Sequence, residues 1–408
     1  MYKEVLMIFR TLTEDEFRYF LDKHPLKTFL QTPEIAQLRE SIGWKKHYVG
    51  VEEGNKLVAG TMMVSRKNRF GVAEFYAPRG FLIDYQNQTL LTYFVKNIKA
   101  YVKKQKGYVL RIDPYLPFRQ RDTNGDLVEG GIDNRSVVSN LKSLGFKQNQ
   151  SEEQAKWMYV LDIDGKTSDE LMKNMKSNTR NNIRKTLKTG ILLQELGYDE
   201  LDQFYQIMVD TGKRKHFEIR SLDYFQKMYQ LYKPRNEIKY LVAKLNLEDY
   251  IKNIQVEIEE NLRKKQSLSD AAYNDSAKKA IDKDCENLQK RIDYASDIMK
   301  EKGKEITLSG SMFVMTQPEI IYLSSGNYEE YMKFYAQYRI QWEMIQYAVE
   351  NGFKRYNFYG IMGNFDPNDP DYGIYSFKKG FNGYVEELIG EFELPTSVWY
   401  NFIKLIHR

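Results

Sequence analysis

The chain has 408 residues, 42% of them hydrophobic, which is enough to bury a core in each of about two domains of ordinary size. Lys and Arg number 61 and Asp and Glu number 56, so the formal charge of +5 permits a polyanionic partner without requiring one. A single cysteine excludes an internal disulfide and a cysteine-based zinc site, and four scattered histidines lack the spacing of metal ligands, so we expect no metal ion.

The sequence also bears on the compartment. No run of about eighteen apolar residues occurs, which argues against a membrane-spanning helix. The opening segment MYKEVLMIFRTLTEDEF reaches acidic residues too early for a signal peptide. We therefore expect a cytoplasmic protein.

The first unit, residues 1–155, is predicted to alternate strands and helices. Thr13 and Glu16 form a capping box that starts a helix, and Thr32 caps a second helix over 33–42, which carries Arg39 on its surface. The turn EEGN joins two strands as a hairpin. The remaining predicted elements of this unit are strands at 5–9, 46–51, 57–65, 72–76 and 108–112 and an amphipathic helix at 90–104.

Asp113 follows the strand at 108–112, where the chain enters a loop. Carboxylates at strand ends are well placed for function, but an aspartate before proline is also a common turn starter, and both interpretations stay open. Residues 122–130, DTNGDLVEG, resemble a calcium loop only superficially, because the glycine is misplaced and no glutamate follows at the required distance. We predict an Asn124-Gly125 turn instead.

The second unit begins with a strand at 157–163 and a second capping box, Thr167 with Glu170. The helix predicted after it carries cations on one face, at spacings of three and four. These cations are Lys173, Lys176, Arg180, Arg184 and Lys188. Such a face is usually just solvated, but a row of cations also suits phosphates.

Arg220 and Tyr224 lie four residues apart where Ser221 is expected to cap a helix. Backbone N–H groups at a helix N-terminus favour anions, so this segment is a candidate pyrophosphate site. An ion pair between Arg220 and a nearby acid is the alternative, and it stays open.

Residues 246–304 interrupt the hairpin expected between strands at 239–245 and 305–313. Their apolar residues alternate at spacings of three and four, which predicts two antiparallel coiled-coil helices joined near 267–274. A strand at 319–324, a helix at 331–350 and a strand at 355–359 then copy the first unit. Each unit reads β-α-α-β-β-β-α-β, an order that resembles the acetyltransferase fold called GNAT, present twice.

The predicted fold is therefore α/β, with two GNAT-like units that have mixed central sheets. The predicted domains are 1–155 for the first unit, 156–245 and 305–408 for the two parts of the second unit, and 246–304 for the inserted helical arm.

The stretch 354–392 reads as a strand, a loop, a short helix and another strand. The short helix carries Phe377, Lys378 and Lys379, beside a strand that ends near Tyr359. Adjacent lysines among aromatic residues suggest a positive charge in a semi-dry cleft, which suits an anionic ligand or a developing oxyanion. A solvated helix end is the alternative.

The ordered patterns RYNFYG, DYG, SFKKGFN and ELIGEF resemble the C-terminal signature of the Fem family of aminoacyltransferases. FLQTPEIAQL, RGFLIDY and LRIDPYLPF extend this resemblance over nearly the whole chain. Enzymes of that family add amino acids from aminoacyl-tRNA to the stem-peptide lysine of peptidoglycan precursors. The resemblance implies the same double GNAT-like fold and an acyltransferase activity, with glycine, alanine or serine as the donated residue.

The resemblance also implies roles for individual residues. Precursor contacts fall on Arg39, Arg220, Tyr224 and Tyr322. The transfer step involves Phe377, Lys378 and Tyr359, with Asp113 and Glu391 as matching acidic positions. The expected tRNA contacts are Lys173, Lys176, Arg180, Arg184 and Lys379.

The implied partners are aminoacyl-tRNA and a lipid-linked precursor at the inner face of the membrane, and a dimer with a homologue is left open. No glycine-rich pyrophosphate loop precedes a helix, so we expect neither coenzyme A nor another cofactor. The alternative to an enzyme is a noncatalytic adaptor, in which a degenerate acetyltransferase scaffold carries a coiled coil that binds a protein or RNA.

Overall fold

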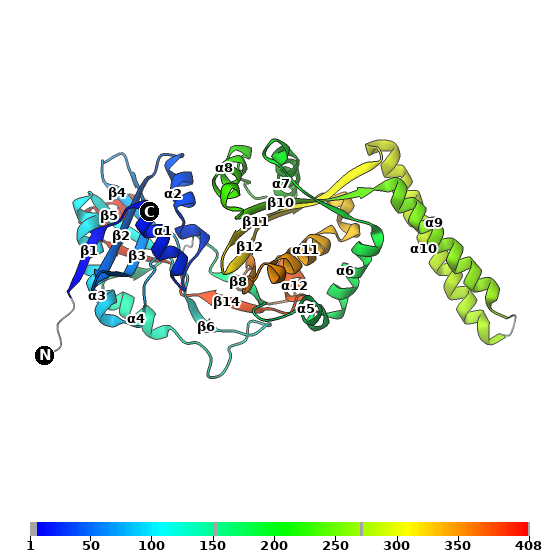
Figure 1. Cartoon of the computed structure of the whole chain (residues 1–408), viewed down its shortest axis with the longest axis horizontal. Helices are drawn as coiled ribbons and strands as arrows, with labels where there is room; N and C mark the ends of the chain where they lie inside the picture. The colour runs from blue at the N-terminus through cyan, green and yellow to red at the C-terminus, as the bar shows by residue number, and fades with distance from the viewer. Residues whose placement is uncertain (1–5, 150–152, 270–271, 407–408) are drawn as a thin grey trace. The chain divides into compact units, whose positions relative to one another are not determined.

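The structure, a computed structural model, describes residues 6–149, 153–269 and 272–406 (Figure 1). The chain folds into two compact units of mixed α/β structure. Unit 1 consists of Met1–Asp162, Thr316–Ile321 and Arg355–Arg408, and unit 2 of Ile163–Met315 and Tyr322–Lys354. These limits differ from the predicted domain boundaries, because the C-terminal segment that we expected in the second unit belongs to unit 1.

Unit 1 contains a seven-stranded sheet with the strand order β1-β2-β3-β4-β5-β15-β7. All of its neighbours are antiparallel except β4 and β5, which run parallel and are connected through helix α3. Its strands are β1 (Met7–Thr11), β2 (Lys45–Glu53), β3 (Lys56–Lys67), β4 (Ala73–Ala77), β5 (Gly107–Ile112), β7 (Lys147–Gln148) and β15 (Phe392–Pro395).

Five helices and a short 3-10 helix accompany this sheet. They are α1 (Glu14–Lys23), η1 (Phe29–Gln31), α2 (Pro33–Glu40), α3 (Gln88–Lys104), α4 (Arg135–Ser143) and α13 (Trp399–Ile406). The predicted capping box is present: the Thr13 side chain accepts from the backbone N–H of Glu16, and the Glu16 side chain accepts from the backbone N–H of Thr13. The apolar stripe of α3 is buried as its periodicity predicted, with Leu91, Phe94 and Ile98 in the core of the unit.

A second group of strands in unit 1 has the order β6-β14-β8-β13, followed by the first residues of β12. Their bounds are β6 (Pro117–Gln120), β8 (Trp157–Asp162), β12 (Glu319–Asn327), β13 (Arg355–Gly360) and β14 (Tyr384–Leu388), and helix α12 (Tyr372–Lys379) lies between β13 and β14 in sequence. In β12, residues up to Ile321 belong to unit 1 and those from Tyr322 to unit 2.

The last predicted strand of the stretch 354–392 is divided in two. β14 pairs with β8, whereas β15 pairs with β5, with Phe392 opposite Ile112. Gly390 between them has φ 87, a left-handed conformation that glycine adopts without strain. This glycine lets the chain pass from one group of strands to the other.

Unit 2 carries the strand order β12-β11-β10-β9, with antiparallel pairing of β10 to both β9 and β11. Its strands are β9 (Leu192–Glu195), β10 (Ile238–Asn246) and β11 (Glu305–Thr316), and its 3-10 helices are η2 (Tyr198–Glu200), η3 (Lys233–Arg235), η4 (Ala272–Asn274) and η5 (Glu329–Phe334). Its α-helices are α5 (Ser168–Asn174), α6 (Ser177–Thr189), α7 (Leu201–Lys215), α8 (Leu222–Tyr232), α9 (Leu247–Ser267), α10 (Asp275–Lys302) and α11 (Ala336–Glu350).

Two predicted helices of unit 2 are interrupted. The basic helix breaks at Met175 and Lys176, whose extended backbone separates α5 from α6. The helix predicted over 331–350 begins as η5, and α11 starts only after Tyr335, which has φ 58. In both places a non-helical residue ends one helical segment before the next begins.

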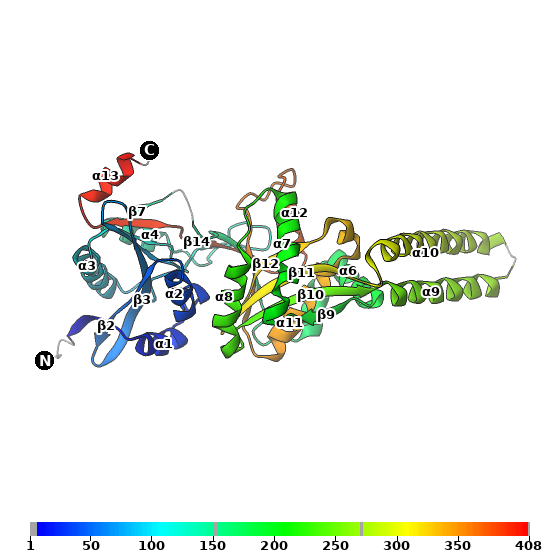
Figure 2. The same ribbon diagram turned by 90° about the horizontal axis from the view of Figure 1, so that it is seen from above.

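The inserted arm consists of α9 and α10, which run antiparallel and side by side (Figures 1 and 2). Asn261 Nδ2 donates to Asp284 Oδ2 at 3.2 Å across the pair, and Lys265 forms an ion pair with Asp282 at 2.5 Å. The coiled-coil geometry of the pair stays a prediction. Every helix in the described part of the chain is too short or too polar to span a lipid bilayer.

Candidate functional site

Lys378, on α12, is buried with 6% of its surface exposed. Its Nζ donates to the backbone carbonyl oxygens of Gly360 at 2.6 Å and Tyr359 at 3.3 Å. Burial lowers the pKa of Lys378 to about 7, because the protonated amine is poorly solvated there. Lys378 is therefore not a solvated helix end, and its amine gains or loses its charge near neutral pH.

The end of β13 is built to receive this lysine. The pairing of β13 with β8 shifts register between Asn357 and Gly360, and Tyr359 has φ 62. Asn357 Oδ1 accepts the backbone N–H of Tyr359 at 2.7 Å and holds this irregular segment. A bulge of this kind frees carbonyl groups from the ladder, and here two of them accept from Lys378.

Asp113 lies just beyond β5, as expected, and is almost fully buried. Its Oδ1 accepts the backbone N–H of Arg79 at 2.8 Å, and the Arg79 guanidinium lies 3.5 Å from Oδ2. Burial raises the pKa of Asp113 to about 6, although the charge of Arg79 opposes this. Among the described residues, no hydrogen-bond donor reaches Asp113 Oδ2.

Tyr359 links these two groups. Its backbone carbonyl accepts from Lys378, and its hydroxyl donates to Gln154 Oε1 at 3.3 Å. Burial raises the pKa of Tyr359, while the nearby charge of Arg79 lowers it and that of Asp113 raises it. Lys378, Tyr359 and Asp113, all predicted from the sequence, thus belong to one cluster in unit 1.

Arg79 is a member of this cluster that sequence reasoning missed as a site residue. It is the first residue of the segment RGFLIDY, and its Nη2 also donates to the carbonyl of Ala155 at 2.6 Å. Its only signal in the sequence is its place in that segment, because an isolated arginine is otherwise typical of a surface.

A second buried network supports β13. Tyr115 donates to Glu319 at 2.9 Å, and Asn357 Nδ2 donates to the same carboxylate at 3.1 Å. Arg355 pairs with Glu319 at 3.3 Å and with Glu386 at 2.9 Å. Burial raises the pKa of Glu319 even beside Arg355. These residues fix the strand from which Tyr359 and Gly360 extend.

Glu391 is buried and makes structural contacts. Its carboxylate accepts from the backbone N–H of Glu153 at 3.2 Å and lies 3.6 Å from Arg111 Nη1. Glu153 in turn pairs with Arg111 at 2.6 Å and with Arg39 at 3.4 Å. The structure therefore connects Glu391 to the predicted precursor contact Arg39 through Arg111 and Glu153.

The other residues of α12 lie beside Lys378. Phe377 is half-buried and packs on Phe381, with ring centroids 5.5 Å apart. The amine of Lys379 lies 5.2 Å from the ring centroid of Tyr375. Both side chains flank the buried lysine on the same short helix.

In unit 2, Ser221 caps α8 as predicted, and its Oγ accepts the backbone N–H of Tyr224 at 3.2 Å. The Arg220 guanidinium lies 5.5 Å from the ring centroid of Tyr224. Among the described residues, no ion pair joins Arg220 to a carboxylate. Its charge therefore stays available at the N-terminus of α8.

Tyr322 is buried, unlike the other predicted precursor contacts. Its hydroxyl is hydrogen-bonded to Ser325 and lies 3.1 Å from Gln337 Oε1. Burial raises the pKa of Tyr322 to about 12. Its hydroxyl is thus hydrogen-bonded to other residues of unit 2.

The predicted basic face is only partly free. Lys173, Lys176 and Arg184 are exposed. Arg180 instead turns back on α5, where its guanidinium donates to the carbonyl of Lys173 at 2.8 Å and also to that of Met175. Arg180 therefore caps α5.

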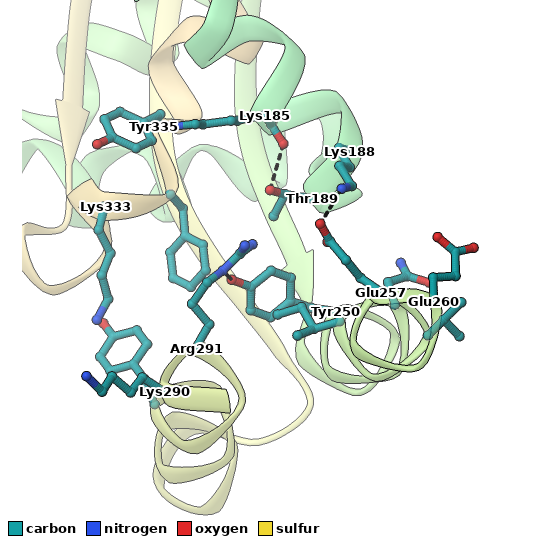
Figure 3. Close-up of a pocket in the computed structure, with 15 residues that line it drawn as sticks. Lys185, Lys188, Thr189, Tyr250, Glu257, Glu260, Lys290, Arg291, Lys333 and Tyr335 are labelled. Atoms are coloured by element: carbon teal, nitrogen blue, oxygen red, sulfur yellow. Dashed lines mark hydrogen bonds and ion pairs between the residues drawn. The ribbon is translucent and has the colours of Figure 1, made fainter. Parts of the chain in front are cut away.

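Unit 2 also contains a cavity of about 770 Å³ where α6 and η5 meet the arm (Figure 3). Cationic and aromatic side chains line most of it, and two of its cations have polar partners within the lining. Lys188 pairs with Glu257 at 2.6 Å, and Arg291 Nε donates to the hydroxyl of Tyr250 at 3.0 Å. No local pattern in the sequence predicted this cavity.

The fold of the chain is similar to that of two solved structures. It is similar to the crystal structure of FemX, with a TM-score of 0.76, 24% identity, and coverage of 98% of this chain and 100% of that one. It is also similar to a tandem GNAT protein from the clavulanic acid biosynthesis pathway, with a TM-score of 0.51, 10% identity, and coverage of 96% and 99%. The predicted fold class is confirmed.

The chain belongs to the FemAB family, whose model matches residues 12–408. The aminoacyltransferase FemA of Staphylococcus aureus strain RF122 is 32% identical to it over 408 residues, which cover 96% of each chain. FemA of strain N315 matches it to the same extent. The family resemblance read from the sequence is confirmed.

Proposed function

We propose that this chain transfers glycine, alanine or serine from aminoacyl-tRNA to the stem-peptide lysine, or to the growing cross-bridge, of a lipid-linked peptidoglycan precursor. Membership of the FemAB family and relatives named aminoacyltransferase FemA support this activity. The observation that carries the proposal is the buried Lys378, held on the carbonyls of Tyr359 and Gly360 with a pKa of about 7.

In the reaction, the acceptor amine attacks the ester carbonyl of the donor. A C–N bond forms, the C–O bond to the tRNA ribose breaks, and the proton lost by the amine ends on the ribose oxygen. The ester is already activated, so positioning and stabilisation of the oxyanion suffice. Protonated Lys378 supplies positive charge in a dry environment, where its effect on an oxyanion is largest.

Asp113 is the candidate for moving the proton. Its pKa of about 6 makes it a carboxylate at neutral pH that still binds a proton readily. Arg79 contacts both of its oxygens, because the Arg79 backbone N–H donates to Oδ1 and the guanidinium lies 3.5 Å from Oδ2, which accepts no hydrogen bond among the described residues. Tyr359 and Phe377 would position the reacting groups, and the contacts of Glu391 suit a supporting role.

The two substrates would be bound by separate charged groups. Arg220 at the N-terminus of α8, with Tyr224, suits the pyrophosphate of the precursor. Arg39 and Tyr322 are further proposed precursor contacts. The exposed charges of Lys173, Lys176 and Arg184, together with Lys379, suit the phosphates of tRNA, whereas the capping role of Arg180 makes it the weakest member of this set.

The cavity between α6, η5 and the arm is a further candidate contact for tRNA. Its lysines and tyrosines combine charge for phosphate with rings on which a base can stack. Lys185, for example, lies 5.8 Å from the ring centroid of Tyr335 (Figure 3). We propose a cytoplasmic enzyme at the inner face of the membrane, and a dimer with a homologue stays a prediction.

A transfer assay tests the proposal directly. Purified protein is incubated with glycyl-, alanyl- or seryl-tRNA and the lipid-linked precursor, and the product is identified by mass spectrometry. The expected product gains one of these residues on the stem lysine or on the bridge. If none of the three donors gave transfer, the noncatalytic adaptor would become the better interpretation.

A further inference from the structure

Several elements of the seven-stranded sheet of unit 1 converge at one end of its strands. β2 begins there and β3 ends there, because Lys45 lies opposite Ser65. β4 and β5 begin there too, since Lys67 lies opposite Ala73 and Ala73 opposite Gly107. β15 also ends at this place, where Pro395 pairs with Val109, and helix α13 follows (Figure 2). The β3–β4 turn and α13 are therefore neighbours.

The turn and the helix together expose a cluster of apolar side chains, which we call the Trp399 patch. It consists of Phe70, Val398, Trp399, Phe402, Leu405 and Ile406. Val398 is 85% exposed and Leu405 71%. Phe70 connects the two segments, because its ring centroid lies 6.0 Å from that of Trp399 and 5.7 Å from that of Phe402. An aromatic cluster this exposed is typical of an interaction site.

The patch is not needed to attach α13 to unit 1. Tyr400 and Ile403 on the opposite side of the helix are buried, and Tyr400 donates to Glu393 at 2.8 Å. Lys404 also pairs with Glu393, at 2.9 Å. The helix thus has one apolar side that packs on the unit and a second apolar side that faces outward.

Cations surround the patch. The residues before Phe70 in the turn include Arg66, Lys67 and Arg69, and the Arg69 guanidinium lies 4.9 Å from the ring centroid of Phe70. Arg66 and Lys67 also line a cavity of about 510 Å³, together with three further lysines. Those three are Lys45, Lys104 and Lys106.

Acidic groups are few in the same region, where Glu74 lies opposite Arg66 across β3 and β4 and Glu393 pairs with Lys404. Among the described residues that line this cavity there is no aspartate or glutamate. The segments 66–71 and 397–406 also contain none. The positive charge beside the patch is therefore not neutralised by the residues that carry the patch.

This combination of charge and apolar surface identifies the occupant. A bilayer with anionic lipids offers phosphate groups to the cations and an interfacial layer to the apolar rings, and tryptophan is enriched at such interfaces. A second copy of the chain fits less well, because a two-fold contact would bring the same cations close to one another.

We propose that the Trp399 patch and the cations around it dock unit 1 on the surface of an anionic lipid membrane. Trp399, Phe402 and Leu405 enter the headgroup region, and the cavity beside Arg66 and Lys67 receives a lipid phosphate. The inference rests on the proposed function in one respect, namely that a lipid-linked acceptor requires an enzyme at a membrane surface.

Vesicle flotation tests the proposal with the full-length protein. Vesicles contain either phosphatidylcholine alone or phosphatidylcholine with phosphatidylglycerol, each at two salt concentrations. We expect binding to the anionic vesicles that weakens as salt rises, because exposed charges are screened. Trp399→Ser/Phe402→Ser and Lys67→Glu/Arg69→Glu should each lower the affinity by about tenfold or more.

Two matched variants serve as controls. Leu192→Ser removes an exposed apolar side chain of unit 2, and Lys56→Glu reverses an exposed charge at the opposite end of β3. Both should bind the anionic vesicles within about twofold of the unchanged protein, because neither residue lies in the proposed face. Thermal unfolding checks that every variant is folded, and the charge-reversal pair keeps the test valid if the apolar pair does not fold.

Unchanged vesicle binding of both folded patch variants would overturn the inference, as would equal binding to neutral and anionic vesicles. Light scattering measures whether the protein dimerises. If the unchanged protein formed a dimer but did not bind vesicles, and the patch variants were monomers, the face would be assigned to a second copy of the chain. Transfer to a soluble acceptor without the lipid should be unchanged in the patch variants. If the unchanged protein gave no transfer but still bound vesicles through the patch, only the proposed function would fail.

Discussion

Arg79 binds Asp113 through both its backbone and its side chain. The Arg79 backbone N–H donates to Asp113 Oδ1 at 2.8 Å, and its guanidinium lies 3.5 Å from Oδ2. Both side chains are almost fully buried. Removing one member of such a pair leaves an uncompensated buried charge. Arg79 therefore lowers the free-energy cost of burying the ionised carboxylate of Asp113.

Arg79→Met should therefore destabilise the protein by about 3 kcal/mol at pH 7.5. The loss should be smaller at pH 5, because Asp113 has a pKa of about 6 and would be protonated and neutral there. Urea unfolding at the two pH values measures this. Arg79→Met/Asp113→Asn should recover part of the loss at pH 7.5, and a double variant no more stable than the single one would contradict the pairing.

Lys378→Met should lower transfer by about 10²- to 10³-fold while the protein stays folded. The methionine is nearly isosteric and removes the charge together with the hydrogen bonds that the amine donates to the carbonyls of Tyr359 and Gly360. Lys379→Met, on the same helix, is the matched control and should affect the apparent affinity for tRNA rather than turnover. A folded Lys378→Met protein that kept more than about half of its activity would exclude the catalytic role.

The pKa of Lys378 predicts a pH dependence of turnover. As pH rises through about 7, the buried amine loses its charge, so turnover should fall on the alkaline side. Lys378→Arg keeps a charge at all these pH values, so whatever activity it retains should lack this fall. Single-turnover rates of the unchanged protein and of Lys378→Arg between pH 6 and 9 test this. If turnover fell equally in the two proteins at high pH, the titration of Lys378 would not be its cause.

Stability gives an independent measure of the same group. The pKa of Lys378 is about 7 in the folded chain, whereas an ordinary exposed lysine has a pKa of 10.5, so between these values the unfolded chain binds more protons than the folded one. The free energy of unfolding should therefore rise with pH over this range through Lys378. Lys378→Met should reduce the slope of that rise. It should also be more stable than the unchanged protein at or below pH 7. An unchanged slope would mean that the pKa is not lowered.

Local signals predicted much of the fold. The capping boxes at Thr13 and Thr167 are both present, and the stripe of α3 is buried. The Asn124-Gly125 turn is also confirmed, because Asp122 Oδ1 accepts the backbone N–H of both Asn124 and Asp126. Such contacts join residues only a few positions apart, so residue type and spacing are enough to predict them.

Contacts between distant residues were not predictable in the same way. The break between α5 and α6 is accompanied by Arg180, which donates to carbonyls at the end of α5, whereas its spacing suggested only a basic face. The pairing of β15 with β5 brings Phe392 opposite Ile112, far apart in the chain. Lys378 was predicted as a site residue in a semi-dry cleft, from the aromatic residues around it and from the family resemblance, but the two carbonyls that accept from its amine required the structure. Arg79 had no local signal of its charge partner.

Arg220→Ala should raise the apparent Michaelis constant for the precursor more than it lowers turnover. A phosphate contact stabilises the bound ground state and the transition state alike. Lys227→Ala on α8 is the control, because it removes a cation that pairs with Asp223 at 2.8 Å. If turnover collapsed while the affinity for the precursor stayed the same, Arg220 would not be its anchor.

The arm can be shortened without disturbing its base. The base packs against the rest of unit 2, because Tyr250 on α9 contacts Phe334 with ring centroids 5.6 Å apart, so removal of the whole arm would expose that ring. Residues 261–284 lie beyond the base, and their ends are joined by the hydrogen bond from Asn261 to Asp284 at 3.2 Å. A short turn containing glycine can therefore replace them.

We expect the shortened protein to be soluble and to keep its affinity for the precursor, because Arg220 and the Lys378 cluster are unchanged. Its apparent affinity for aminoacyl-tRNA should fall, with a smaller salt dependence, since any phosphate contacts made by the removed cations are lost. Titration of labelled tRNA against both proteins at two salt concentrations measures this. Lys188→Ala, which removes a cation of the cavity at the base, shows whether contacts remain there. Identical affinity and salt dependence of the full and shortened proteins would exclude the distal arm from donor binding and assign it to contacts with another protein.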